Sequence, residues 1–105
     1  MVRHINVDYS KAFIKASKRL SGKILDSLRR TIVEVKAAKE IQEITDCKKL
    51  VGYRNIYRIR LGDYRALFTI EIEFSGDTIV FQYLVSRGEA YGKKIQTELK
   101  RIDKE

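Results

Sequence analysis

The sequence predicts an α+β fold in a single domain that spans residues 1–105. Its length is typical of one domain. Apolar residues recur at helical spacing before residue 40 and again near the C-terminus, whereas the period from Tyr53 onward is two. We therefore expect the order β-α-α-β-β-β-α: an N-terminal strand and a helical hairpin packed on one face of an antiparallel β-sheet, with a C-terminal helix.

The N-terminal third is expected to supply the first strand and the helical hairpin. Arg3–Val7 has the character of a short strand. Ser10 is suited to cap a helix that runs to about Leu20, with Phe13, Ile14 and Leu20 facing inward. A second helix is expected from about Lys23 to Lys39, and its apolar stripe comprises Ile24, Leu25, Leu28, Ile32 and Val35.

Alternation predicts the strands that follow. Tyr57, Ile59 and Leu61 share one face, and after Gly62-Asp63 that face continues through Tyr64, Ala66, Phe68, Ile70, Ile72 and Phe74. A third strand, Thr78–Val85, is apolar on both faces, as expected of a central strand. The last helix is expected from about Glu89 to Ile102, with the stripe Tyr91, Ile95, Leu99 and Ile102.

The face opposite this apolar one carries arginines. A two-residue type II′ turn at Gly62-Asp63 pairs Leu61 with Tyr64 and Arg60 with Arg65, with Cβ atoms roughly 5 Å apart. Arg58 shares that face, so three guanidinium groups are expected on one patch although like charges repel. Because arginine suits bidentate phosphate contacts, the patch favours anion binding. The alternative is an exposed sheet face whose charges are screened by salt.

Two residues of "VSRGEAY" extend this patch. Arg87 lies at the end of the central strand, and Tyr91 follows one helical turn later. Tyr91 is either a core tyrosine on the stripe of the last helix or a ring at the edge of the arginine patch on which a nucleobase stacks.

The composition limits which classes of partner and cofactor we expect. The net charge of +8 favours an acidic partner such as nucleic acid, an acidic protein or an anionic membrane. The N-terminus lacks the apolar region of a signal peptide and no run is long enough to span a membrane, so we expect no membrane association and a cytoplasmic location. Cys47 and His4 alone do not make a zinc site, and no metal or cofactor is expected.

Two motifs resemble a known family. "LVGYRNIYRIRLGDYRALF" is similar to the signature of the RelE/ParE superfamily of bacterial toxins from type II toxin–antitoxin systems, and "VSRGEAY" resembles its closing element, an arginine followed four residues later by a tyrosine. The resemblance covers nearly the whole chain and includes the helical hairpin before the sheet.

The RelE branch implies a ribosome-dependent, metal-independent endoribonuclease that cuts messenger RNA at the 30S decoding site. The 2′-hydroxyl attacks the adjacent phosphate and leaves a 2′,3′-cyclic phosphate. By position, Arg58 and Arg60 match basic strand residues, and Arg65 matches an arginine thought to stabilise the transition state. Arg87 matches an arginine near the leaving oxygen, and Tyr91 matches the tyrosine that stacks on a base.

The chain departs from the family at Arg60, where the best-known member has a lysine proposed as general base. A guanidinium does not readily lose a proton, and Glu89, the acidic residue near Arg87, is typical of a helix start. Two alternatives therefore stay open: a ParE-like toxin that binds DNA gyrase without catalysis, or a degenerate member that only binds its antitoxin. In each case the family implies a small cognate antitoxin as partner.

Overall fold

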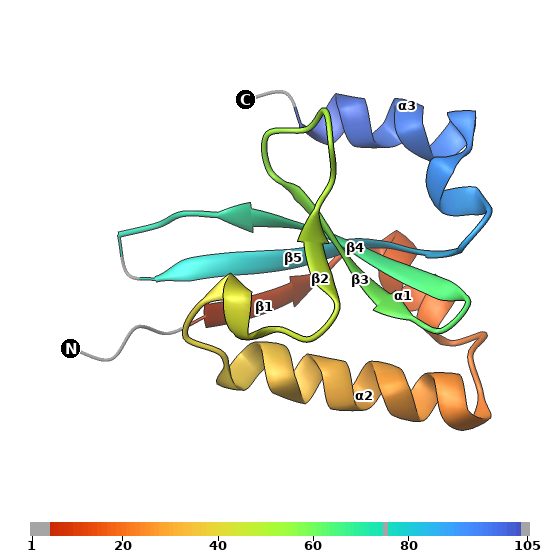
Figure 1. Cartoon of the computed structure of the whole chain (residues 1–105), viewed down its shortest axis with the longest axis horizontal. Helices are drawn as coiled ribbons and strands as arrows, with labels where there is room; N and C mark the ends of the chain where they lie inside the picture. Colours follow the sequence, from red (N-terminus) through yellow and green to blue (C-terminus); the bar gives the residue numbers. More distant parts are fainter. Residues whose placement is uncertain (1–4, 75, 104–105) are drawn as a thin grey trace.

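The computed structural model describes residues 5–74 and 76–103, and these residues form a five-stranded sheet in the order β1-β5-β4-β3-β2 (Figure 1). The strands are β1 (Ile5–Tyr9), β2 (Cys47–Lys49), β3 (Ile56–Leu61), β4 (Tyr64–Glu71) and β5 (Asp77–Ser86). The α-helices are α1 (Lys11–Ser17), α2 (Gly22–Ala37) and α3 (Lys93–Ile102), and the short 3₁₀ helices are η1 (Ile41–Glu43) and η2 (Glu89–Tyr91). The predicted α+β class is confirmed.

The sheet is mixed, so the prediction of an antiparallel sheet is wrong at one edge. β1 runs parallel to β5, with Ile5 opposite Asp77 and Tyr9 opposite Phe81. The other neighbouring pairs are antiparallel. A parallel pair needs a long crossover, and the chain between β1 and β5, which includes α1 and α2, supplies one.

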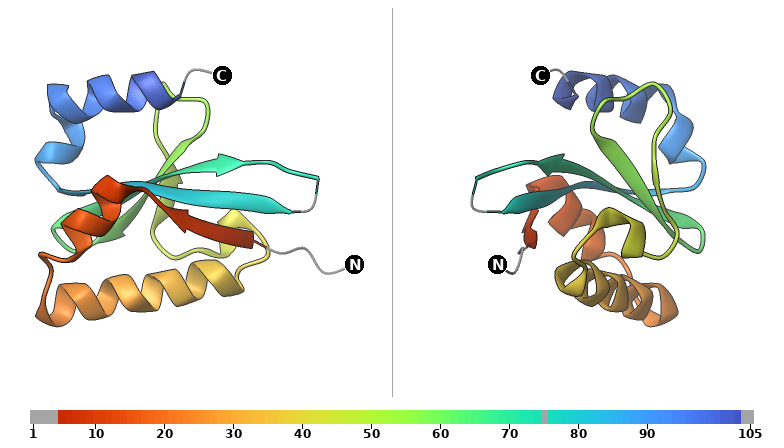
Figure 2. Two further views of the ribbon diagram at one scale, coloured as in Figure 1. Left: turned by 180° about the vertical axis from the view of Figure 1, so that it is seen from behind. Right: turned by 60° about the vertical axis from the view of Figure 1, so that its left-hand side comes forward.

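Helices cover both faces of the sheet, so the prediction that they lie on one face is also wrong (Figures 1 and 2). Alternate residues of a strand point to opposite faces. Ile59 and Phe68 belong to a large core beneath α1 and α2. Ile56 and Leu67 belong to a second core with Leu99 of α3. The arginine-bearing face of β3 is therefore partly covered by the C-terminal helix.

The helical hairpin follows the prediction except at the end of its first helix. The Ser10 side chain caps α1 by accepting a hydrogen bond from the Phe13 N–H at 3.0 Å. Phe13 and Leu20 are buried, as expected. However, α1 ends at Ser17 rather than near Leu20, and Ile14 is 41% exposed. The expectation that Ile14 faces inward is wrong, because it falls on the outer side of a short helix.

The structure also differs from the prediction at the end of β4 and between α2 and β3. β4 ends at Glu71, so Ile72 and Phe74 do not continue its apolar face and are exposed. η1 and the three-residue strand β2 were not predicted, because neither is long enough to show a period. Arg3, His4 and Ser75 lie outside the described residues. Within those residues, no helix is long and apolar enough to cross a membrane.

The predicted C-terminal helix is divided at Gly92 into η2 and α3. The Gly92 N–H donates to the Glu89 carbonyl at 3.1 Å, which closes η2 before α3 begins. Ile95, Leu99 and Ile102 remain on the apolar stripe and pack in the second core. Tyr91 leaves that stripe and is 65% exposed, so it is not a core tyrosine.

Candidate functional site

The hairpin of β3 and β4 has the predicted register. Leu61 pairs with Tyr64 and Arg60 with Arg65. Gly62 has a φ of 59°, in the left-handed region that the first central position of a type II′ turn requires. Two arginines therefore stand opposite each other on the face that α3 partly covers.

Arg65 turns its guanidinium back onto this turn. One terminal nitrogen donates to the Gly62 carbonyl at 2.8 Å and to the Tyr64 carbonyl at 2.9 Å. The side chain is only 7% exposed, and its buried Nε has no partner among the described residues. The carbonyl oxygens bring partial negative charge to Arg65, which offsets the repulsion from Arg60 across the strand pair.

Arg60 lies two residues from Arg58 on β3, but it lines a different cavity. It lines a cavity of about 360 Å³ together with Arg30 and Glu34 of α2. Its backbone N–H donates to the Asp46 carbonyl at 3.1 Å. The three guanidinium groups that the sequence predicts on one patch therefore share a face of β3 and β4 but have different surroundings.

A second cavity, of about 540 Å³, brings together Arg58 and Tyr91, which are far apart in sequence. Its lining also includes Lys48, Lys49, Tyr53 and Gln96. We call this the basic cavity. The Arg58 guanidinium donates to the Asp46 carbonyl at 3.0 Å, which fixes its position above β2.

The lining of the basic cavity includes three cationic side chains and no carboxylate. Lys48 is the register partner of Arg58, so the two side chains leave the same face of neighbouring strands. An exposed aromatic ring beside clustered cations is an arrangement that holds a nucleotide, with the ring against the base and the cations against phosphate. Sequence reasoning found Arg58 and Tyr91 but missed Lys48 and Lys49, because β2 was not predicted.

Hydrogen bonds fix the short segment that carries Tyr91. Gln96 of α3 donates from Nε2 to the Ala90 carbonyl at 3.0 Å. The Tyr53 hydroxyl donates to Oε1 of the same amide. Burial, with a smaller contribution from the Asp103 charge, raises the pKa of Tyr53, so its hydroxyl keeps the proton that it donates. The chain Tyr53–Gln96–Ala90 thus holds η2 against the mouth of the cavity.

Arg87 is exposed just beyond β5, and its backbone N–H donates to the Asp63 carbonyl at 2.7 Å. It therefore stands beside the hairpin turn, and it does not line the basic cavity. Glu89 accepts a hydrogen bond from the Ser86 N–H at 2.9 Å, and that bond is the main cause that lowers the pKa of Glu89. This carboxylate caps a turn and is a weak base.

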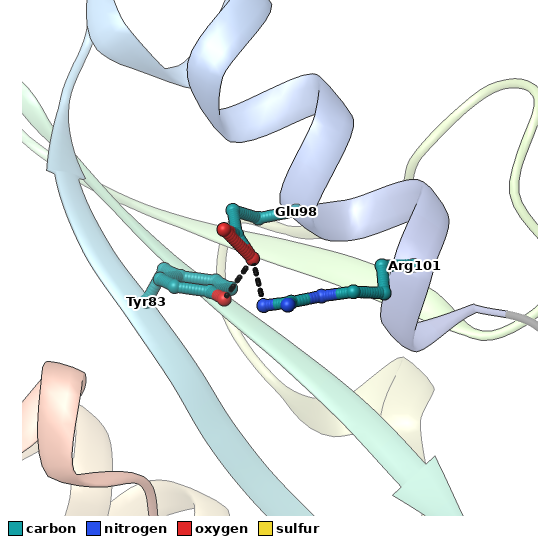
Figure 3. Close-up of polar contacts among 3 residues, drawn as sticks. All are labelled: Tyr83, Glu98 and Arg101. Atoms are coloured by element: carbon teal, nitrogen blue, oxygen red, sulfur yellow. Dashed lines mark hydrogen bonds and ion pairs between the residues drawn. The ribbon is translucent and has the colours of Figure 1, made fainter.

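Other polar groups near the site are structural. The Tyr83 hydroxyl and the Arg101 guanidinium both donate to Glu98, which links β5 to α3 (Figure 3). Burial raises the pKa of Cys47 to about 11, so its thiol stays protonated near neutral pH and is not a nucleophile.

Comparison with known proteins identifies relatives along most of the chain. No family model matches it. The toxin RelE3 of Methanocaldococcus jannaschii is 36% identical over 88 residues, which are 83% of this chain and 96% of that protein.

Solved structures share the fold. The toxin of the RelB–RelE antitoxin–toxin complex from Methanococcus jannaschii has a TM-score of 0.64 and 31% identity, over 82% of this chain and 96% of that one. The RelE–RelB complex from Pyrococcus horikoshii OT3 gives a TM-score of 0.64 and 26% identity, over 86% and 100%. A mutant of the E. coli toxin RelE in the free state has a TM-score of 0.69 and 19% identity, over 94% of this chain and 97% of that one.

Proposed function

The chain belongs to the RelE family of toxins from toxin–antitoxin systems, and we propose that it is a ribosome-dependent endoribonuclease that cuts messenger RNA and so inhibits translation. The basic cavity is the observation that carries this proposal. It combines an exposed tyrosine ring with three cations and no carboxylate in its lining. That combination suits one nucleotide of a single strand, with the base on Tyr91 and the phosphate near Arg58 and Lys48.

The proposed reaction is an internal transesterification of RNA. The 2′-oxygen attacks the adjacent phosphorus, the bond from phosphorus to the 5′-oxygen breaks, and the products are a 2′,3′-cyclic phosphate and a 5′-hydroxyl. The phosphorane gains negative charge on the way, so fixed cations that face it lower the barrier. Holding the 2′-oxygen in line with the leaving oxygen lowers it further.

The proposed roles combine the family resemblance with the surroundings of each side chain. Arg58 binds the phosphate and Tyr91 stacks on the base. Arg87, exposed beside the turn, faces the leaving oxygen. Arg65 braces the turn through its carbonyl bonds and adds positive potential behind the phosphate, and Arg60 contributes charge from the separate cavity that it lines. The reaction proposed here uses no metal or cofactor.

A cognate antitoxin is the proposed protein partner. The relatives from Methanococcus jannaschii and Pyrococcus horikoshii were each solved in complex with RelB. A chain with a net charge of +8 attracts an acidic segment, and electrostatic steering speeds such association. Because its proposed target is the translating ribosome, we place the toxin in the cytoplasm.

Induced expression followed by mapping of messenger RNA 5′ ends tests the proposal. Wild-type protein should produce in-frame cuts in translated messages and arrest growth. Tyr91→Ala should reduce cleavage roughly 5- to 150-fold, because base stacking contributes about 1–3 kcal/mol per base. Arg58→Ala should also reduce cleavage, because it removes a phosphate contact. Arg29→Ala is the matched control, since this exposed arginine lies on α2, across the sheet from the cavity.

Two outcomes would contradict the proposal. Growth arrest with inhibited DNA supercoiling and no cut messages would indicate a gyrase-binding toxin. No growth arrest, with a folded chain that still binds its antitoxin, would indicate a degenerate member.

A further inference from the structure

The basic cavity holds an amine at a position where it can act on the RNA. Lys48 of β2 is the register partner of Arg58 of β3, and both side chains leave the same face of the sheet. Both line the cavity that also holds the Tyr91 ring. A phosphate bound at Arg58 with its base on Tyr91 would therefore place the intervening ribose close to Lys48.

Cleavage by the 2′-hydroxyl needs a group that takes its proton. The guanidinium of Arg58 does not lose a proton in proteins, and neither does that of Arg60. Glu89 is held in a capping interaction with Ser86, and it does not line the cavity. An amine is basic once it has lost its proton, which makes lysine a usable general base.

The other titratable groups around the cavity are less suited to this task. Tyr53 donates its hydroxyl proton to Gln96, and burial raises its pKa. Tyr91 presents its ring to the cavity from η2. Lys49 also lines the cavity, but its register partner is Tyr57, whose ring stacks on Phe68 in the core on the opposite face. The Lys49 side chain therefore leaves β2 on the face away from Arg58.

We propose that Lys48 is the general base of this toxin, an inference that rests on the proposed ribonuclease function. The unprotonated amine of Lys48 accepts the 2′-hydroxyl proton as the 2′-oxygen bonds to phosphorus and the bond to the 5′-oxygen breaks. The departing 5′-oxygen takes a proton from water. The Lys48 ammonium then returns its proton to the resulting hydroxide, so the catalyst is regenerated and no co-reactant is consumed.

The test is the rate of single-turnover cleavage of ribosome-bound messenger RNA between pH 6.5 and 8.5. Because only the unprotonated amine accepts the 2′-hydroxyl proton, the wild-type rate should rise with pH over this range. Lys48→Arg keeps the charge but removes the base, so the rate should fall at least about a hundredfold and lose this slope. Affinity for the same RNA with a 2′-deoxy cleavage site should stay within about threefold of wild type, since phosphate attraction is retained.

Two variants complete the design. Lys36→Arg is the matched control, since this exposed lysine lies on α2 and away from the cavity, and it should keep the wild-type rate and slope. Lys48→His supplies a different base, so its rate should level off near pH 6.5, the ordinary pKa of imidazole being about 6.5. Lys48→His also keeps the proposal testable if Lys48→Arg does not fold.

The outcomes separate this inference from the proposed function. If wild-type protein cuts the message and Lys48→Arg cuts it at the same rate and slope, Lys48 is not the base but the ribonuclease assignment stands. An equal loss in Lys36→Arg would mean that the loss does not come from the cavity, which also overturns the inference. If wild-type protein cuts no message, both proposals fail together.

Discussion

Arg65 keeps a positive charge on a side chain that is only 7% exposed, and carbonyl oxygens of its own turn compensate that charge. The two bonds come from one terminal nitrogen, and the turn they brace carries Asp63, whose carbonyl accepts the Arg87 N–H. At the scale of a single residue, Arg65 therefore braces the turn that the residue after β5 contacts, and it adds charge to the site.

Replacing Arg65 should cost stability as well as activity. Hydrogen bonds that involve a charged group contribute about 1.5–3 kcal/mol, so Arg65→Ala should lower the free energy of unfolding by roughly that amount. Urea denaturation with two independent probes measures the change. Arg60→Ala is the control, since it removes the other arginine of the cross-strand pair without touching these carbonyl bonds. Equal stability of wild type and Arg65→Ala would show that the turn does not depend on the guanidinium.

Among the elements, β2 and η2 decide the shape of the basic cavity. β2 adds Lys48 beside Arg58, and η2 carries Tyr91 away from the stripe of α3. Both are only three residues long, so neither has a hydrophobic face broad enough to fix it. β2 is fixed by its pairing with β3, and η2 by the hydrogen bonds from Tyr53 to Gln96 and from Gln96 to Ala90.

Tyr53→Phe tests whether this contact positions Tyr91. The change removes the hydroxyl that donates a hydrogen bond to Gln96 and keeps the ring that packs in the second core. A net hydrogen bond contributes about 0.5–1.5 kcal/mol, so affinity for single-stranded RNA should weaken by up to about tenfold. Fluorescence titration with a short labelled RNA measures the affinity.

Tyr83→Phe is the matched control, because Tyr83 packs in the same core but its hydroxyl contacts Glu98, not η2 (Figure 3). It should bind RNA like wild type. A similar loss in both variants would mean that the effect comes from the core and not from the position of Tyr91.

Across the whole molecule, the net charge attracts a polyanion and the two-faced sheet determines where it can bind. A net charge of +8 attracts any polyanion, but the sheet assigns its two faces to different tasks. One face is buried beneath α1 and α2, and α3 packs on the other (Figure 2). The basic cavity is lined by residues of β2, β3, η2 and α3. The net charge attracts RNA from a distance, and the basic cavity is where clustered cations and the Tyr91 ring occur together.

Salt dependence should report how many cations the RNA contacts. For single strands, the slope of log affinity against log salt is about −0.7 per phosphate neutralised, so the three cations of the cavity predict a slope of about −2. Arg58→Ala should make this slope shallower by about 0.7, whereas Arg29→Ala on α2 should leave it unchanged. Filter binding between 50 and 300 mM salt, on the order of physiological ionic strength, measures both. An identical slope for wild type and Arg58→Ala would remove Arg58 from the RNA contacts.

The sequence alone determined the hairpin register, the helical hairpin and the family, because the interactions and motifs that decide these features are local. The positive φ at Gly62 and the alternation on either side of it set the register that pairs Arg60 with Arg65. The Ser10 cap and the apolar stripe of α2 set the helical hairpin. The motifs around Arg58 and Arg87 were enough to indicate the family that the relatives show.

Tertiary structure decided the rest, because those features depend on contacts between distant segments. The parallel pairing of β1 with β5 and the packing of α3 on the second face depend on which apolar surfaces remain uncovered after the hairpin forms. Tyr91 is exposed because its segment, η2, is held by Gln96 of α3, and Gln96 in turn is held by Tyr53, which is distant in sequence. Lys48 joined the site only because β2 pairs with β3, and three residues carry no period from which that pairing can be predicted.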